Sequence, residues 1–172
     1  MSDVPVNEAQ EIHDVVLRYC RGIDRLDLDL VRSAYHPDGI DHHTGFDGTV
    51  DEFCAWVEAG LRMLGGTMHL AGNHLSEIRG DQAVSETYVT AHHWGPDPDD
   101  DSLSFTTGAR YVDHFERREG RWAIAERWAV REWLRRDRLR PASSPGLVSS
   151  RDAEDPLAKL RARLLGQERL AD

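Results

Sequence analysis

Several residue types that would define a class of protein are scarce in this sequence. Its 172 residues include two cysteines, Cys20 and Cys54, both in segments predicted to be helical. Two cysteines are too few to predict a disulfide framework or a thiolate zinc site. This low number is typical of proteins in a reducing cytoplasm. No window approaches the roughly 18 apolar residues of a membrane span, and the N-terminal residues lack a basic region followed by an apolar run. We therefore expect a soluble cytoplasmic protein without a membrane partner.

Positive charge is also in short supply. The chain has 21 Lys and Arg residues against 31 Asp and Glu residues, which gives a formal net charge of -10. Binding to a nucleic-acid backbone depends on an excess of Lys and Arg, so a nucleic-acid partner is not expected. The length and a hydrophobic content of 40% fit one globular domain with room for a core and a ligand cavity.

The first third of the chain has the pattern of helices. A capping box at Asn7 and Gln10 precedes apolar residues at helical spacing, which predicts a helix to about residue 25. A short helix is predicted over 28–35, because the segment HPDG after it contains a proline and has the composition of a turn. The pattern then predicts, in order, a strand over 40–44, a turn over 45–48 and a helix over 50–64 that ends at two glycines.

The middle of the chain alternates polar and apolar residues with the period of strands. The alternating segments are 67–78, 82–94, 104–118 and 121–134. Two of the three connections are tight turns, which favours antiparallel hairpins, and the third is an acidic loop over 95–101. Helices followed by such a sheet indicate an α+β domain in which the sheet curls around its helices and a pocket lies between them.

The C-terminal part has a different composition. Residues 141–156 are rich in Pro, Ser and Gly and are predicted to be a linker, and Asp155-Pro156 can start a helix with Leu157, Leu160 and Leu164 on one face. We therefore divide the chain into a domain over 1–140 and a linker with a tail helix over 141–172. We expect the tail helix to dock on its own domain or on a neighbouring subunit.

The order of four segments resembles a known family. The segments are YCRGIDRLDLDLVRSAYHPDG, DHHTGFDG, TMHLAGNHLSEI and GARYVDHFERREGRWAIAERW. Together they resemble the SnoaL-like branch of the nuclear transport factor 2-like superfamily over residues 7 to about 135. This resemblance implies a cone-shaped α+β barrel, with N-terminal helices packed in the concavity of a curved, mostly antiparallel sheet. It also implies a homodimer or homotrimer joined through the convex sheet face, for which an exposed Trp128 or Trp133 would be suitable.

The resemblance also implies site residues. Scytalone dehydratase, bile-acid 7-alpha-dehydratase and hexachlorocyclohexane dehydrochlorinase use a histidine at the start of the first long strand, oriented by an aspartate at the end of the first helix. The matching residues are His69 and Asp24. Tyr19 matches a tyrosine that the dehydratases point at the substrate oxygen, where the dehydrochlorinase has a lysine. His92 falls where the bile-acid enzyme has an aspartate, and Arg127 matches an arginine that lines the dehydrochlorinase pocket.

These residue types suit acid and base chemistry without a metal or an organic cofactor. A histidine has an unperturbed pKa of about 6.5, and a carboxylate on its other ring nitrogen fixes the tautomer and stabilises the imidazolium. We predict His69 as the base, Asp24 as the group that orients it, and Tyr19 as a donor to the oxygen on which charge develops. His69 or His92 would return a proton to a departing hydroxide. The predicted substrate-binding residues are His92, Arg127 and His42.

The pattern leaves structural alternatives open. Asp24 lies at the edge of the apolar helix face and would also suit a solvated helix end, and Tyr19 would also suit the core. His92 and His93 point to opposite faces of a strand, and the resemblance favours His92 for the pocket. His74 has the opposite parity from His69 and is expected at the surface or in packing.

The last strand is ambiguous as well. The larger apolar side chains favour the face with Trp122 and Trp128 as core, which would turn Arg127 away from the pocket, unless that face forms a subunit interface. A bulge that switches the parity is a further alternative. A three-histidine metal site built from His42, His69 and His92 is geometrically feasible, but no spaced ligand motif accompanies it.

Two classes of function follow. The favoured one is a lyase or isomerase that acts on a largely apolar cyclic substrate, with dehydration ahead of double-bond isomerisation and cyclisation. The alternative is a noncatalytic small-molecule-binding domain, or an assembly subunit like the small subunit of the ring-hydroxylating dioxygenases. A purely structural subunit has no need of a histidine and an aspartate that meet in a cavity, so this pair separates the two classes.

Overall fold

The computed structural model describes residues 7–97, 99–139 and 150–165. The chain divides into two units, Met1–Pro141 and Ala142–Asp172, each of which is described by itself. In the second unit, α4 spans Pro156–Leu164, and the Asp155 side chain accepts a hydrogen bond from the Leu157 backbone N–H at 2.9 Å. The predicted tail helix is therefore present. Residues 141–149 of the predicted linker lie outside the described residues.

The first unit begins with helices that are started by polar side chains. These helices are α1 (Glu8–Arg25), α2 (Leu28–Arg32) and α3 (Val50–Arg62). Asn7 caps α1, Asp27 caps α2, and Thr49 forms a capping box with Glu52 at the start of α3, so orphan N–H groups are satisfied at each start. The predicted helices are confirmed, although α2 ends three residues earlier than expected and the Asn7 side chain accepts from Ala9 instead of forming a box with Gln10.

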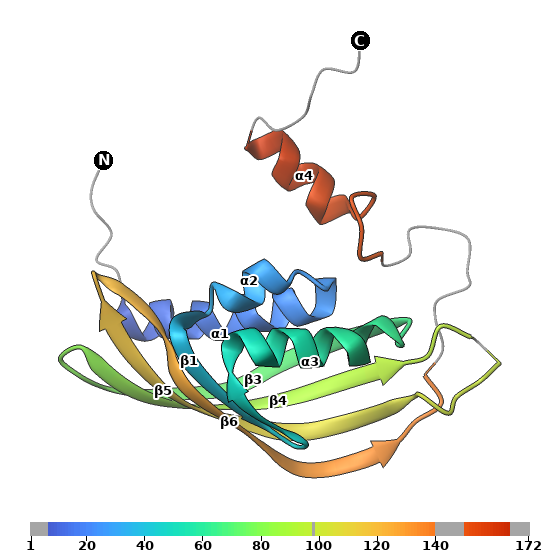
Figure 1. Cartoon of the computed structure of the whole chain (residues 1–172), viewed down its shortest axis with the longest axis horizontal. Helices are drawn as coiled ribbons and strands as arrows, with labels where there is room; N and C mark the ends of the chain where they lie inside the picture. The colour runs from blue at the N-terminus through green and yellow to red at the C-terminus, as the bar shows by residue number, and fades with distance from the viewer. Residues whose placement is uncertain (1–6, 98, 140–149, 166–172) are drawn as a thin grey trace. The chain divides into compact units, whose positions relative to one another are not determined.

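Six strands form one curved sheet, and the three helices lie on one of its faces (Figure 1). The sheet order is β2-β1-β6-β5-β4-β3, and only the β1–β6 pair is parallel. This architecture confirms the predicted α+β class with a curved, mostly antiparallel sheet. The strands are β1 (Tyr35–His43), β2 (Phe46–Thr49), β3 (Gly66–Arg79), β4 (Gln82–Trp94), β5 (Phe105–Arg118) and β6 (Arg121–Arg136).

One predicted turn is absent, and a second is shorter than expected. The segment 36–39 lies inside β1, where the register between β1 and β6 is irregular between Tyr35 and Ile40. A proline lacks an N–H for a strand ladder, and an irregular stretch is where a strand tolerates it, so Pro37 does not end the strand. The turn expected over 45–48 is shorter, because β2 already starts at Phe46 and Gly45 takes the positive φ of 88°.

The core lies between the helices and the concave sheet face. The apolar face of α1 is buried, and alternate residues of β4 and β5 face it. Gly22 allows α1 and α2 to approach closely, since a Cβ there would stand 2.6 Å from Val31 Cγ2. The largest apolar and aromatic side chains that are almost fully buried are Ile12, Val15, Val16, Tyr19, Val31, Tyr35, Phe53, Phe115 and Ile124.

A bulge decides which side chains of β6 enter the interior. Ile124 and Glu126 pair with the consecutive residues Phe115 and His114, so Ala125 is an extra residue in β6. Trp122 and Ile124 are buried before the bulge, and Arg127 is buried after it, while Trp128 is 40% exposed. The alternative in which a bulge switches parity is therefore the correct one, and the expectation that both tryptophans share the core face is wrong.

A second irregularity changes the face of His74. The pairing of β3 with β4 shifts between Ala71 and His74, which turns His74 toward the same side as His69, contrary to the predicted opposite parity. The ring of His74 stacks on His13 of α1 with 4.7 Å between ring centroids, and its Nδ1 lies 2.8 Å from Thr87 Oγ1. His74 is thus a packing residue, as expected, at a place separate from the cavity described below.

Candidate active site

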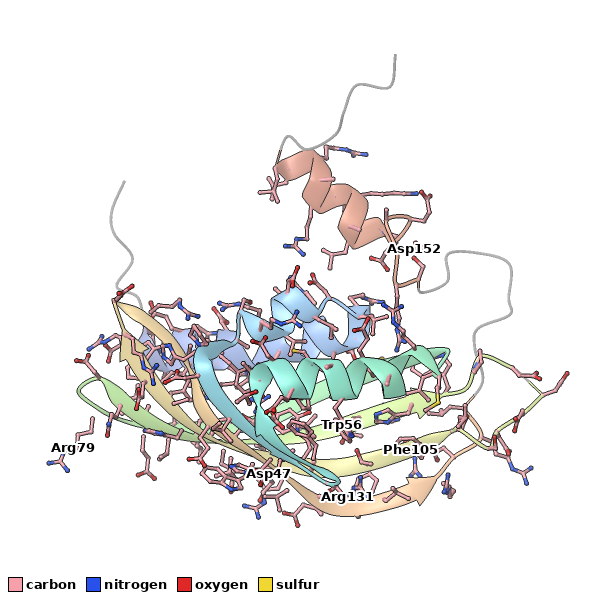
Figure 2. All side chains as sticks on the ribbon, viewed as in Figure 1. Asp47, Trp56, Arg79, Phe105, Arg131 and Asp152 are labelled. Atoms are coloured by element: carbon pink, nitrogen blue, oxygen red, sulfur yellow. The ribbon has the colours of Figure 1, made fainter. Side chains whose placement is uncertain are left out.

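A cavity of about 190 Å³ lies between the helices and the concave face of the sheet. Trp56 of α3, Phe105 of β5 and Arg131 of β6 line it from three different elements (Figure 2). Most of the other lining side chains are aliphatic or aromatic, which suits an apolar ligand. The polar side chains in the wall include three histidines and two tyrosines, namely His43, His69, His93, Tyr19 and Tyr111.

The first polar group is a hydrogen-bonded histidine and aspartate. His69 Nδ1 donates to Asp24 Oδ1 at 2.6 Å, and the His69 backbone N–H donates to Asp24 Oδ2 at 2.9 Å. Thr67 Oγ1 adds a third hydrogen bond to Asp24 Oδ1 at 3.0 Å. Both side chains are largely buried, with 6% of His69 and 15% of Asp24 exposed. The carboxylate fixes the proton of His69 on Nδ1 and leaves Nε2 as the nitrogen that can accept another.

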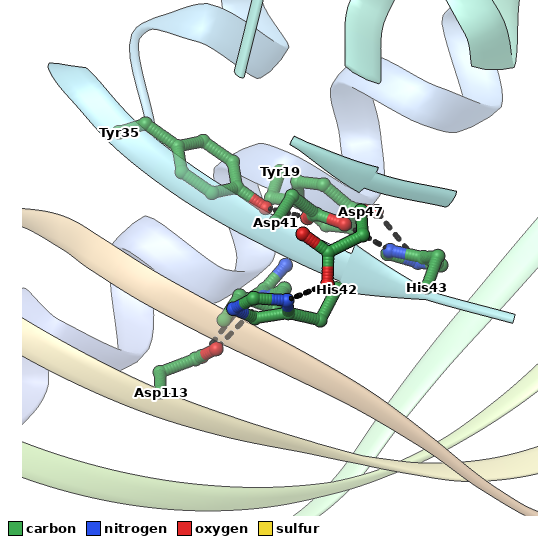
Figure 3. Close-up of polar contacts among 8 residues, drawn as sticks. Tyr19, Tyr35, Asp41, His42, His43, Asp47 and Asp113 are labelled. Carbon is green, nitrogen blue, oxygen red and sulfur yellow. Dashed lines mark hydrogen bonds and ion pairs between the residues drawn. The ribbon is translucent and has the colours of Figure 1, made fainter. Parts of the chain in front are cut away.

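A second histidine and aspartate pair also borders the cavity. His43 Nδ1 donates to Asp41 Oδ1, and the Tyr35 hydroxyl donates to Asp41 Oδ2 at 2.5 Å (Figure 3). The Asp41 side chain is completely buried and that of His43 is 21% exposed. Sequence reasoning missed this pair. The available signal was the spacing of two in the segment DHH, which puts Asp41 and His43 on one face of a strand.

Tyr19 lies beside the second pair. Its hydroxyl is 3.5 Å from His43 Nε2, and its ring packs edge-on against Tyr111 with 5.5 Å between ring centroids. Burial raises the pKa of Tyr19 well above its usual value, and the neighbouring Tyr111 adds to this effect. The hydroxyl therefore keeps its proton and can act as a hydrogen-bond donor in the cavity.

Arg127 does not line the cavity but packs behind two side chains that do, Tyr19 and Tyr111. Its guanidinium forms two 2.7 Å hydrogen bonds to Asp113, and both side chains are completely buried. The guanidinium carbon stands 4.2 Å from the centre of the Tyr19 ring and 4.3 Å from that of Tyr111. The expectation that Arg127 contacts substrate is thus corrected. The bulge turns it inward, but the two tyrosine rings lie on it, and Arg131 is the arginine in the cavity wall.

Of the two adjacent histidines on β4, the structure places His93 and not His92 in the wall of the cavity. His93 stacks on Phe105 with 4.1 Å between ring centroids and lies 6.1 Å from the ring of His69. Burial, together with the neighbouring His69, lowers the pKa of His93 to about 4. His92 points to the other sheet face, where its Nδ1 is 2.9 Å from Thr106 Oγ1, because the odd positions of β4 face inward.

His42 is also outside the cavity. It stacks on Trp128 with 5.0 Å between ring centroids and contacts Asp47 at 2.7 Å and Glu126 at 3.0 Å. The sequence-based assignment of His42 and His92 to substrate binding is therefore corrected by strand parity. Within residues 7–97, 99–139 and 150–165, no three histidine, cysteine or acidic side chains are grouped so as to hold a metal ion. The same residues contain no helix long and apolar enough to cross a membrane.

Comparisons with known proteins agree with this architecture. Among solved structures, a putative scytalone dehydratase from Novosphingobium aromaticivorans is 16% identical, with a TM-score of 0.68 over 83% of this chain and 95% of its own. A hexachlorocyclohexane dehydrochlorinase is 18% identical, with a TM-score of 0.66 over 81% and 95% of the two chains. The Kfla4162 protein from Kribbella flavida is 20% identical, with a TM-score of 0.67 over 73% and 91%. At these identities the likeness shows the fold alone.

The sequence itself gives the more specific match. Among curated proteins, none matches the chain. The model of the SnoaL-like domain matches residues 5–128, which is most of the first unit. With the curved sheet, the covering helices and the cavity between them, this match means that the chain belongs to the SnoaL-like domain family.

Proposed function

We propose that the protein is a cofactor-independent lyase or isomerase, with dehydration as the favoured reaction and His69 as the catalytic base. The observation that carries the proposal is the 2.6 Å hydrogen bond from His69 Nδ1 to Asp24 Oδ1 at the edge of a largely apolar cavity. A carboxylate behind an imidazole is the arrangement that orients a general base and stabilises the cation formed when it takes a proton.

The substrate class follows from the cavity. Its volume of about 190 Å³ is below the roughly 300–1,000 Å³ of pockets for drug-sized ligands, so we propose a small cyclic molecule of one or two rings. Aromatic and aliphatic walls favour an apolar skeleton, and the Tyr19 hydroxyl gives one donor for a substrate oxygen. The neighbours named as a dehydratase and a dehydrochlorinase support an elimination, which needs a base at carbon and a leaving group on the adjacent carbon.

In the proposed reaction His69 Nε2 removes a proton from a carbon next to a carbonyl group. Tyr19 donates a hydrogen bond to the hydroxyl oxygen on the adjacent carbon, on which negative charge develops as it leaves, in an interior where such a bond is stronger than in water. Asp24 is a positioning residue: the hydrogen bonds from Thr67 and from the His69 backbone N–H hold its carboxylate in place. His93 keeps a neutral ring beside His69, because its pKa is lowered to about 4.

The test is a screen of cyclic β-hydroxy ketones for loss of water, followed through the ultraviolet absorption of the enone product. We expect His69→Gln and Asp24→Asn to reduce kcat/KM by about 10²–10⁴-fold, the range for loss of general base catalysis. His74→Gln is the matched control, because His74 is on the same strand and the same face but outside the cavity.

A second readout tests the role of Asp24 independently of turnover. The ¹⁵N chemical shifts of the His69 ring should show the proton on Nδ1 in the wild type and a change of tautomer in Asp24→Asn. Binding of apolar cyclic ligands without turnover, with His69→Gln as effective as the wild type, would contradict the proposal and favour a noncatalytic binding domain.

A further inference from the structure

The pair of His43 and Asp41 has no part in the reaction described so far. Asp41 is completely buried, and its two carboxylate oxygens each accept one hydrogen bond, from His43 Nδ1 and from the Tyr35 hydroxyl. A buried carboxylate is stable only when its oxygens are paired, and both partners here come from the same strand, β1. The result is a chain of three side chains that ends at His43 Nε2.

The ring of His43 is held so that this nitrogen is available. It stacks on Phe53 with 4.8 Å between ring centroids, and His43 lines the cavity. The Tyr19 hydroxyl at 3.5 Å from Nε2 is too far for a strong hydrogen bond. Both groups therefore remain able to contact a bound molecule. One oxygen atom of that molecule can contact the Tyr19 hydroxyl and His43 Nε2 together.

The two groups differ in what they can give to that oxygen. Tyr19 is completely buried and its pKa is raised well above its usual value by that burial, so it donates a hydrogen bond and keeps its proton. A carboxylate behind an imidazole orients the ring and stabilises the imidazolium, from which a proton can be transferred. Of the two side chains at this position, His43 is the one suited to transfer a proton.

We propose that His43 is a second catalytic acid/base residue, which delivers a proton from Nε2 to the substrate oxygen contacted by Tyr19, with Asp41 and Tyr35 as positioning residues. This inference rests on the proposed function of His69 as the base. The cavity then has a base for carbon, backed by Asp24, and an acid for oxygen, backed by Asp41.

In a dehydration the two histidines act in one turnover. The C–H bond breaks, its proton goes to His69 Nε2, and its electron pair forms the new carbon–carbon double bond. The C–O bond on the adjacent carbon breaks with its electron pair on oxygen, and that oxygen takes the proton of His43 Nε2 and leaves as water. His69 ends protonated and His43 neutral, and proton exchange with solvent restores both.

The experiment uses benzisoxazoles, small bicyclic molecules whose elimination needs no knowledge of the natural substrate. A base removes the proton from C3, the N–O bond breaks, and the product is a nitrile with a phenolate oxygen that an acid can protonate. Ring substituents change the acidity of the leaving phenol. A 5-nitro group gives a stable phenolate that needs no acid, while the unsubstituted compound gives a basic one that benefits from an acid.

The two histidine variants should respond differently to this series. His69→Gln should lose most of the rate for every member, about 100-fold or more, and His43→Gln should lose about 100-fold with the unsubstituted compound but less than about threefold with the 5-nitro compound. The plot of log kcat/KM against the pKa of the leaving phenol should therefore be steeper in His43→Gln than in the wild type. His42→Gln is the matched control, since His42 is the next residue of β1 and lies outside the cavity.

Asp41→Asn keeps the size of the side chain and tests the pair without removing His43. It should steepen the same plot by a smaller amount and change the tautomer of His43 in ¹⁵N NMR spectra. An unchanged slope in both variants, or an equal loss for all members in both, would overturn the inference and leave a structural role for His43. If His69→Gln retains full activity, or the wild type does not accelerate the reaction, it is the proposed function that fails.

Discussion

The two histidine and carboxylate pairs of the cavity are assembled in different ways. Asp24 and His69 come from α1 and β3 and meet only when the helix lies on the sheet, and a hydroxyl and a backbone N–H complete the site. Asp41 and His43 are two residues apart on β1, and their carboxylate is completely buried. The first pair is partly open to water at its carboxylate, and the second is not. The same hydrogen-bonded arrangement of a histidine and an aspartate can thus be formed by tertiary packing or by the period of a single strand.

The largest effect is expected from removing Arg127, whose guanidinium packs against the ring of Tyr19. Tyr19 lines the cavity together with His43 and His69. Arg127→Met leaves the Asp113 carboxylate buried without a partner, and breaking such a pair costs about 3–5 kcal/mol of unfolding free energy. Urea unfolding measures the loss. Arg131→Met is the control, because Arg131 is exposed and should change stability by less than about 0.5 kcal/mol. Equal effects of the two variants would show that the buried pair is not a structural support.

The difference in carboxylate burial predicts a difference in stability. Asp41→Asn should lower the unfolding free energy by about 2–3 kcal/mol, because an amide leaves a donor of Tyr35 or His43 without an acceptor in a site that excludes water. Asp24→Asn should lower it by about 1 kcal/mol or less, because Asp24 is 15% exposed and water can replace a lost partner. Chemical unfolding at pH 7.5 compares them, and a larger loss in Asp24→Asn would reverse the comparison.

His93 gives a test through pH. Its pKa is about 4 in the folded protein and about 6.5 in an unfolded chain, so the unfolded state binds a proton first as the pH falls. Protonation then favours unfolding, and stability contributed by the neutral ring is present above pH 6.5 and lost as the pH falls toward 4. Between pH 7.5 and 5 the wild type should lose roughly 2 kcal/mol more than His93→Gln, since each pKa unit corresponds to about 1.4 kcal/mol.

The control for this pH effect is His92→Gln, whose side chain lies on the other sheet face. It should keep the pH dependence of the wild type. A His93→Gln protein with an unchanged pH dependence would mean that another group accounts for it.

The smallest effect on stability is expected from substitution of His42, which lies between Asp41 and His43 in β1. His42→Gln should change the unfolding free energy by about 0–1 kcal/mol, since its two ion pairs are partly exposed to solvent. Burial lowers the pKa of His42, but hydrogen bonds with Asp47 and Glu126 outweigh it and raise the pKa. Its small contribution should therefore be greatest at mildly acid pH and decline as the pH rises through the folded pKa, which urea unfolding at two pH values would detect.

Much of the fold follows from local pattern, and part of the site does not. The face of α1 with Tyr19 and Asp24 and the start of β3 with His69 were predictable from helical and strand periods and from resemblance to a family. The choice of His92 over His93 was wrong because a matched position in a family does not determine which face of the strand a side chain takes. In the structure the odd-numbered residues of β4 are the ones that face inward. The expected assembly through Trp128 or Trp133, which are 40% and 47% exposed, stays a prediction.

Two features could not be read from the pattern. The bulges in β3 and β6 change parity by one residue, and their positions depend on pairing with neighbouring strands that are distant in sequence. The burial of Arg127 beneath two tyrosine rings likewise depends on residues from α1 and β5. The sequence of β6 alone therefore does not predict the partners of Arg127.

The extra residue Ala125 also bears on how this sequence can diverge. Ile124 and Glu126 already lie opposite consecutive residues of β5, so deletion of Ala125 would make the ladder regular and leave every later side chain on its present face. Arg127 would stay opposite Asp113, and Trp128 would stay on the outer face. Deletion of Ala129, which has a partner in β5, would instead exchange the faces of the residues that directly follow it. Homologues that lack the extra residue are therefore expected to keep the same cavity floor.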